Sequence, residues 1–156
     1  MHNSPCPDNP GAVRATDIMV RDVLTVGPDT TVAQAVSMLT QHGISGLPVV
    51  DRAEHLLGII TDYLLLSMLY HPELGETQVS TIMTKQVITV DEDMPIPEVA
   101  RTLVENRIRR VPVVRGKKVV GIISRENLIR YASGTGEGSS RFFLPTPPPH
   151  PLSEPS

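Results

Sequence analysis

The sequence predicts a mixed α/β (α+β) fold made of two similar halves that pack on each other to complete one core. The motif Ile-Met at Ile18 returns at Ile82, 64 residues later, and the motif Gly-Ile-Ile at Gly58 returns at Gly121, 63 residues later. Self-similar units of this kind bury their apolar faces by stacking on each other. Hydrophobic residues make up 40% of the chain but aromatic residues only 3%, so aliphatic side chains must fill the core.

The first repeat is predicted to open with a short extended segment, residues 23–26, and a helix that ends near His42. After Thr31, apolar residues recur three and four positions apart, which places them on one helical face. They are Val32, Ala35, Val36 and Leu39. Gly43 can adopt the left-handed conformation in which many helices end, and His42 stands where the helix dipole favours a cation.

A pair of strands and a second helix complete the first repeat. Residues 47–50 and 56–60 are predicted strands, joined by the polar turn 51–54. Thr61 is expected to begin a second helix, which continues to Leu69 and stops at the His-Pro pair that follows.

The second repeat follows the same order, with a hairpin connection, at residues 115–118, that is one residue shorter. Ser124 takes the place of Thr61 at the start of its last helix. The apolar face of its first helix consists of Ile96, Val99, Ala100 and Leu103. A unit of about 55 residues buries too little surface to be stable alone. We therefore expect the repeats to cover each other's strands, with helices outside.

Composition divides the chain into four segments. Residues 16–72 and 79–133 are the two repeats. Residues 1–13 are rich in Pro, Asn and Gly and are expected to be a disordered lead. Residues 134–156 form a Gly/Ser/Pro-rich tail that is expected to be disordered and locally extended like polyproline. Its short proline-rich run leaves open that it binds a proline-recognition partner.

Several classes of function are excluded by what the sequence lacks. No apolar run approaches the roughly 20 residues that span a bilayer, and the first residues lack the features of a signal peptide. Cys6 is the only cysteine, so no intrachain disulfide can form, and we expect a cytoplasmic location. The five histidines are scattered, and no nucleophile or phosphate-loop motif occurs, so we predict neither a metal site nor an enzyme.

Charge is distributed unevenly along the chain, whose net charge is −3. Residues 101–130 contain nine basic residues and two glutamates, a net charge of +7, so the remainder carries −10. Such a patch can attract an anion, although it can equally be a solvated surface that also contacts a second copy. The acidic run 91–93 precedes a predicted helix, and we interpret it as favouring that helix N-terminus rather than as a catalytic carboxylate pair.

The order of motifs in both repeats (Ile-Met, Thr-Val, a helix, Leu/Val-Pro-Val-Val, then Gly-Ile-Ile-Thr/Ser) resembles tandem CBS (cystathionine-β-synthase) domains, also called a Bateman module. The resemblance covers residues 16–72 and 79–133. It implies two βαββα repeats in a pseudo-twofold module that commonly forms homodimers. It also implies clefts that bind an adenosyl ligand (AMP, ADP, ATP or, less expected here, S-adenosylmethionine) and a sensor that regulates a partner protein.

The resemblance places one adenosyl site in each of two clefts between the repeats. The predicted main site comprises Val20, Leu24, Ile44, Arg109, Arg110, Ser124 and Asn127. The predicted weaker mirror site comprises Thr84, Ile88, Ile108, Ser45, Gly46, Thr61 and Leu64. Thr61 and Ser124 are also expected to cap their helices, which is compatible with phosphate binding at the same N-termini.

The family motif has an Asp, three residues after the capping Thr or Ser, that accepts hydrogen bonds from ribose hydroxyls. Those positions hold Leu64 and Asn127, so ribose recognition should be lost in the mirror cleft and weakened in the main one. Asp62 should repel a phosphate in the mirror cleft. The main cleft, whose helix begins Ser124-Arg125 beside two further arginines, is predicted to be the cationic, working site.

Our first interpretation is a stand-alone, cytoplasmic, homodimeric CBS-pair module that binds an adenine nucleotide and regulates an unidentified partner. The alternative is a ligand-free dimeric interaction scaffold of the same fold. Nucleic-acid binding is a third possibility, which overall acidity and few aromatic residues disfavour. The dimer contact is expected from the apolar helix faces at residues 64–69 and 128–129.

Overall fold

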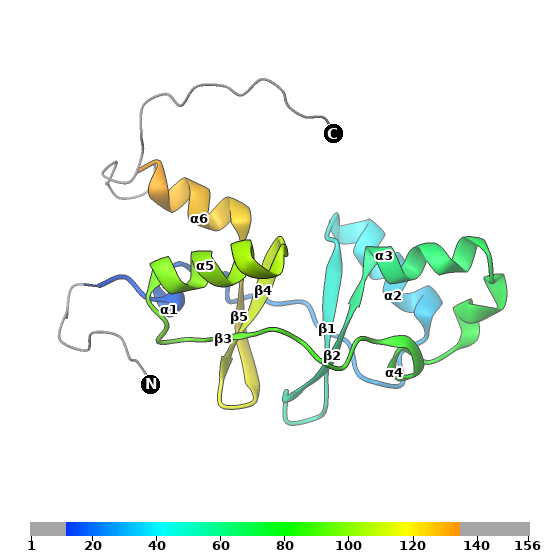
Figure 1. Ribbon diagram of the computed structural model, residues 1–156. Coiled ribbons are helices and arrows are strands. Elements are labelled where there is room, and N and C mark those ends of the chain that lie inside the picture. Colours follow the sequence, from blue (N-terminus) through cyan, green and yellow to red (C-terminus); the bar gives the residue numbers. More distant parts are fainter. Residues whose placement is uncertain (1–11, 135–156) are drawn as a thin grey trace, which may run out of the picture.

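The computed structural model describes residues 12–134, which form two lobes placed side by side (Figure 1). The hairpins lie near the centre, with helices flanking them. The first lobe contains α2 (Val32–His42), β1 (Gly46–Val50), β2 (Leu56–Thr61) and α3 (Asp62–Leu65). The second lobe contains β3 (Val90–Asp91), α5 (Ile96–Asn106), β4 (Arg110–Arg115), β5 (Lys118–Ser124) and α6 (Arg125–Ala132). The predicted α+β fold of two repeats is confirmed. The predicted lead and tail lie almost entirely outside the described residues.

Helix α2 has the ends that the sequence predicts. The Thr31 hydroxyl accepts a hydrogen bond from the Gln34 backbone N–H at 3.1 Å, and the Gln34 side chain accepts one from the Thr31 N–H at 2.9 Å. This reciprocal cap satisfies two N–H groups at the helix start. Gly43 ends α2 in the left-handed conformation, with φ of 64°. The equivalent residue after α5 is Arg107, with φ of 56°, so the same turn forms there without glycine.

The second helix of the first repeat is shorter than predicted. Only α3 is α-helical, and the chain continues as a 3₁₀ turn, η1 (Leu66–Leu69), and then a second 3₁₀ segment, η2 (Pro72–Glu76). Helices often tighten into 3₁₀ geometry in their last turn, and the proline that starts η2 cannot continue an α-helix. The equivalent helix of the second repeat, α6, is α-helical over eight residues.

Each lobe is centred on an antiparallel hairpin with equivalent register. Leu47 pairs with Ile60 in the first hairpin, and Val111 pairs with Ile123 in the second. Successive residues of β1 and β4 are buried, so both faces of these strands are covered. The extended segments predicted at the start of the two repeats pair to different extents. In the second repeat, β3 runs parallel to β4 over two residues, whereas in the first repeat Val26 makes a single parallel bridge to β1.

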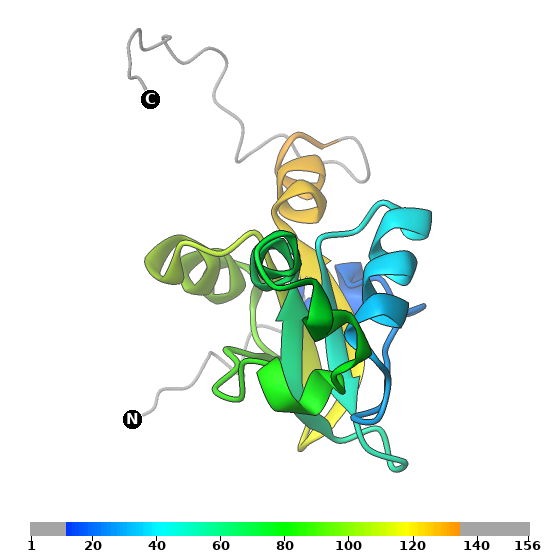
Figure 2. The same ribbon diagram turned by 90° about the vertical axis from the view of Figure 1, so that its right-hand side faces the viewer.

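Each lobe is completed by a segment from the start of the other repeat. Helix α1 (Ala15–Ile18) begins the first repeat, but Ala15 packs in the core of the second lobe. Helix α4 (Val79–Ile82) begins the second repeat, but Val79 packs in the core of the first lobe. Figure 1 shows α1 in the second lobe, where it contacts β5 and α6, and α4 in the first lobe, where it contacts β2. In Figure 2, which looks along the row of lobes, the hairpins lie between α2 on one side and α5 on the other.

Backbone hydrogen bonds fix this exchange of segments. Val20 and Ile122 exchange two bonds of 2.9 and 3.0 Å, and Ile59 and Thr84 exchange two of 2.9 Å. Both pairs are antiparallel bridges, so the last strand of each repeat gains a partner from the other repeat. The repeats therefore cannot separate without losing main-chain hydrogen bonds as well as apolar contacts.

The repeated motifs Ile-Met and Gly-Ile-Ile pack on each other across the repeats. A Cβ added at Gly58 would stand 2.8 Å from the Met83 Cγ and 2.8 Å from the Thr84 carbonyl oxygen. A Cβ added at Gly121 would stand 2.7 Å from the Met19 Cγ. Real Cβ atoms essentially never approach other atoms this closely. The two glycines are therefore required by the close approach of the exchanged segments.

The acidic run before α5 does not serve the helix N-terminus as predicted. The Glu92 carboxylate accepts a hydrogen bond from the Arg115 Nε at 2.7 Å, and this contact holds the pKa of Glu92 below its ordinary value. The Asp91 carboxylate accepts one from the Asp93 backbone N–H at 2.9 Å. Because α5 begins only at Ile96, these acids stabilise the preceding turn and the edge of the hairpin instead.

Replacing Gly58 with Ala is predicted to lower the free energy of unfolding by about 1–3 kcal/mol, the usual cost of overpacking. The obstructing Thr84 carbonyl is backbone and hydrogen-bonded, so it cannot easily move. Gly121→Ala should cost less, because only the flexible Met19 side chain stands in the way. Gly27→Ala is the matched control, with no atom within 4 Å of the added Cβ. Urea unfolding curves measure all three, and equal midpoints for Gly58→Ala and Gly27→Ala would contradict the close approach.

Candidate functional site

Two neighbouring cavities lie between the lobes and share part of their walls. Their volumes, about 430 and 410 Å³, are typical of small-molecule sites. The first, the Thr61 cavity, is lined by Ser45, Gly46, Pro48, Ile59, Thr61, Asp62, Thr84, Gln86, Val87, Ile88, Ile108, Arg109, Arg110, Pro112 and Ile122. The second, the Ser124 cavity, is lined by Val20, Asp22, Val23, Leu24, His42, Ile44, Gly46, Pro48, Arg110, Ile122, Ser124 and Asn127.

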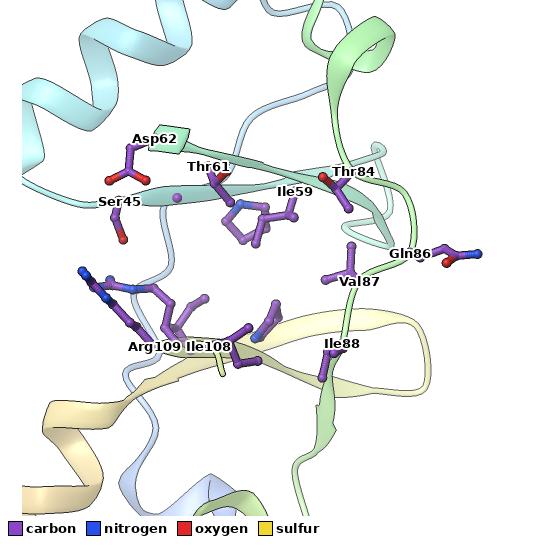
Figure 3. A pocket seen from close by; sticks show the side chains of 15 residues that line it. Ser45, Ile59, Thr61, Asp62, Thr84, Gln86, Val87, Ile88, Ile108 and Arg109 are labelled. Atoms are coloured by element: carbon purple, nitrogen blue, oxygen red, sulfur yellow. The ribbon is translucent and has the colours of Figure 1, made fainter. Parts of the chain in front are cut away.

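The Thr61 cavity has an apolar end and a polar end (Figure 3). Ile59, Val87 and Ile88 lie at the apolar end, where Thr84 also borders the cavity and the Gln86 side chain points away from it. Ser45, Asp62 and Arg109 lie together at the other end, where the two lobes face each other across the cavity. This arrangement can hold a flat apolar group at one end and an anion at the other.

The structure brings the predicted site residues together in two groups. Six residues of the predicted main site line the Ser124 cavity: Val20, Leu24, Ile44, Arg110, Ser124 and Asn127. Six residues of the predicted mirror site line the Thr61 cavity: Ser45, Gly46, Thr61, Thr84, Ile88 and Ile108. The exceptions are Arg109, which lines the Thr61 cavity instead, and Leu64, which lines neither.

The position of Arg109 corrects the predicted distribution of charge. Arg109 directly precedes β4, and Arg110 is the first residue of that strand. Arg110 borders both cavities, whereas Arg109 borders only the Thr61 cavity. Arg125, predicted to stand beside a phosphate, lines a groove between α5 and α6. The Thr61 cavity therefore has two arginines in its wall, and the Ser124 cavity has one.

The helix starts at the two cavities are capped differently. The Ser124 hydroxyl accepts a hydrogen bond from the Asn127 N–H at 3.2 Å, while Asn127 Oδ1 accepts from the Ser124 N–H at 2.8 Å and from its hydroxyl at 3.0 Å. The Thr61 hydroxyl accepts from the Leu64 N–H at 3.4 Å, and Leu64 offers no acceptor in return. The predicted caps are confirmed. Asn127 Oδ1 is already used within the cap, so its NH₂ group is the part available to a ligand.

Sequence reasoning missed several lining residues, and those that lie in strands follow from strand alternation. They include Pro48, Ile59, Val87, Pro112 and Ile122 in the Thr61 cavity and Asp22, Val23 and His42 in the Ser124 cavity. Ile59 and Ile122 are the middle residues of the two Gly-Ile-Ile motifs. Their neighbours Ile60 and Ile123 are fully buried, so alternation turns the middle residue to the opposite face. The alternation within the two Gly-Ile-Ile motifs could therefore have predicted that Ile59 and Ile122 line the cavities.

Within residues 12–134, no three His, Cys, Asp or Glu side chains are grouped so that they could hold a metal ion. In the same part of the chain, every helix is too short or too polar to cross a membrane. The cavity walls instead combine aliphatic side chains, hydroxyls and guanidinium groups.

Comparison with known proteins identifies a family and related structures. The family model of the CBS domain matches the chain twice, at residues 15–71 and 79–134. CBSX2 of Arabidopsis thaliana, crystallised in complex with AMP, is 29% identical with a TM-score of 0.72, and the match covers 80% of this chain and 98% of CBSX2. The CBS domain pair of protein MJ0100, crystallised with 5′-methylthioadenosine and S-adenosyl-L-methionine, is 32% identical with a TM-score of 0.70, and the match covers 79% and 98% of the two chains.

A curated relative is a much longer enzyme. Inosine-5′-monophosphate dehydrogenase of Methanocaldococcus jannaschii is 34% identical over 118 residues. The match covers 75% of this chain but only 23% of that enzyme.

Proposed function

The chain belongs to the CBS domain family, and on that premise we propose that it is a non-catalytic regulatory module that binds an adenine nucleotide between its repeats. The Thr61 cavity carries this proposal. Its wall combines aliphatic side chains with Arg109 and Arg110, neither of which forms an ion pair within the described part of the chain. The AMP complex of CBSX2 supports the choice of ligand class.

In this proposal the adenine base enters the apolar end of the Thr61 cavity, beside Ile59 and Ile88, and the phosphates meet Arg109 and Arg110. Guanidinium groups bind phosphate oxygens through charge-assisted, often bidentate hydrogen bonds. This assignment reverses the ranking expected from sequence, because Arg109 lies here and Arg125 lies elsewhere. The Ser124 cavity becomes the less cationic site, suited to adenosyl compounds that carry less negative charge.

The position of the ligand between the lobes supports a regulatory role. Thr61 and Ser45 belong to the first repeat, whereas Thr84, Ile88 and Arg109 belong to the second. A ligand that touches both repeats favours the relative arrangement in which both sets of contacts are made. A partner protein that binds one arrangement better would then respond to nucleotide concentration. The partner is of unknown identity, and we propose that both act in the cytoplasm.

A thermal-shift screen with AMP, ATP, S-adenosylmethionine, NAD and a short oligonucleotide tests the proposed function. Ligands that bind only the folded state raise the melting temperature as their concentration increases. We expect AMP and ATP to do so. An absence of shift with every adenosyl compound would favour the ligand-free scaffold. A shift with the oligonucleotide alone would favour nucleic-acid binding by the basic segment 101–130.

The Arg109→Ala variant is predicted to bind ATP about 10- to 150-fold more weakly than the wild type, since a hydrogen bond to a charged group contributes about 1.5–3 kcal/mol. Adenosine affinity should change little, because adenosine has no phosphate. Arg101→Ala is the matched control: it removes an equal charge from α5, outside both cavities. Calorimetry measures both affinities. Equal losses of ATP affinity in the two variants would contradict a direct contact and indicate only long-range attraction.

Exposed apolar side chains support a homodimer, which we include in the proposal. Leu69 on η1 is 79% exposed and Ile129 on α6 is 59% exposed. Both border apolar grooves, the first beside α2 and the second beside α5. Large exposed apolar patches mark interaction surfaces. Leu65, which the sequence placed in the contact, is instead buried in its own lobe.

The Ile129→Glu variant is predicted to shift the protein from dimer to monomer, because association would bury an unpaired charge. Its side chain is exposed, so the fold should survive, and circular dichroism checks this. Arg101→Glu, on an exposed position of α5, is the control that should leave the dimer intact. Light scattering after size-exclusion chromatography measures the mass. A wild-type monomer at tens of micromolar would contradict the proposed dimer.

A further inference from the structure

Arg110 borders both cavities, and it is the only Arg or Lys side chain in the wall that they share. That wall consists of Gly46, Pro48, Arg110 and Ile122. Gly46 occupies the position equivalent to Arg110 in the first repeat, at the start of β1, as its pairing with Thr61 shows. Arg110 pairs with Ser124 in the same way at the start of β4. Because Gly46 has no side chain, the wall that the two cavities share carries one cation rather than two.

The guanidinium group of Arg110 is incompletely satisfied. Among the residues that the structure describes, its Nε is the buried side-chain nitrogen without a hydrogen-bond partner. A buried donor left unpaired is costly, so an acceptor that reaches it gains affinity. The donors of arginine are arranged in a planar fork, which bonds best to a single carboxylate or phosphate. The group can therefore serve a phosphate in either cavity, but it cannot serve both fully.

The remaining charges make this competition unequal. Besides Arg110, the charged side chains in the wall of the Thr61 cavity are Arg109 and Asp62. Besides Arg110, the titratable side chains in the wall of the Ser124 cavity are Asp22 and His42, and no other Arg or Lys lines it. A phosphate that engages Arg110 from the Thr61 cavity therefore leaves the Ser124 cavity with little to attract a second phosphate.

We propose that Arg110 makes the two cavities compete for phosphate-bearing ligands, so that a nucleotide in the Thr61 cavity lowers the affinity of the Ser124 cavity for a second nucleotide but not for a neutral adenosine compound. This inference rests on the proposed function. The coupling is reciprocal by thermodynamic linkage, and we expect it to be about tenfold or more. Each chain would then hold one nucleotide together with one neutral adenosyl ligand more readily than two nucleotides.

The test compares two-site binding with binding in variants that keep one cavity. Val20→Trp should fill the Ser124 cavity, and Ile88→Trp should fill the Thr61 cavity, since each residue borders only that cavity. Both side chains are partly exposed, at 47% and 37%, so a larger ring can be accommodated without disrupting the core. Circular dichroism and urea unfolding verify folding, and calorimetry with AMP and with adenosine gives the affinity of each site.

The inference predicts that AMP binds the Ser124 cavity about tenfold or more tightly in Ile88→Trp than it does as the second ligand of the wild type. Adenosine should bind each cavity equally well in the wild type and in the single-cavity variants. Arg110→Gln should abolish the AMP coupling. Arg109→Gln is the control at the neighbouring position. It should lower the affinity of the Thr61 cavity for AMP but retain the coupling between the cavities.

Three results would overturn the shared role of Arg110. They are AMP affinities that match between wild type and single-cavity variants, coupling of equal size with adenosine, and coupling that persists in Arg110→Gln. The first and third leave the proposed nucleotide binding intact. Failure of both AMP and adenosine to bind the wild type would overturn the proposed function, and the role of Arg110 with it.

Discussion

Each lobe of the protein is closed by backbone hydrogen bonds to a segment that belongs to the other repeat. The pairs Val20–Ile122 and Ile59–Thr84 are the centre of this exchange. The exchange explains why a methionine and a glycine recur together in both repeats: each methionine lies over a glycine in the partner repeat. It also explains why neither repeat has a complete core of its own, since α1 and α4 each pack in the opposite lobe.

The cavities follow from the same exchange. The segment that enters the second lobe supplies Val20 and Leu24 to the Ser124 cavity, and the segment that enters the first supplies Thr84 and Ile88 to the Thr61 cavity. A ligand in either cavity therefore touches residues whose position depends on how the lobes are joined. The repeat makes the cavities equivalent in backbone, whereas substitutions at equivalent positions, above all Gly46 and Arg110, make them unequal in charge. Because the two cavities have equivalent backbones but unequal charges, they can prefer different ligands.

The fold was largely predictable from the sequence, because apolar periodicity and turn residues are local signals and the second repeat corroborates the first. Gly43 and the Ser124 cap illustrate this: each required only neighbouring residues. The division of charge between the cavities was not predictable in the same way. It depends on which surface Arg109, just before β4, and Arg125, at the start of α6, border. It also depends on the crossing of segments that are far apart in sequence. The early end of α3 was also missed, because leucines continue the helical pattern beyond the point where the backbone tightens.

Hydrogen exchange at the exchanged backbone pairs tests most directly the claim that the two repeats form one unit around a shared ligand site. The amides of Val20, Ile122, Ile59 and Thr84 donate four of the backbone bonds that join the two repeats. If the lobes separate only on global unfolding, these amides exchange as slowly as the core amides of β1 and β4, and AMP slows all four together. Rapid exchange at these amides while the strand cores remain protected, or protection by AMP confined to one lobe, would contradict the account.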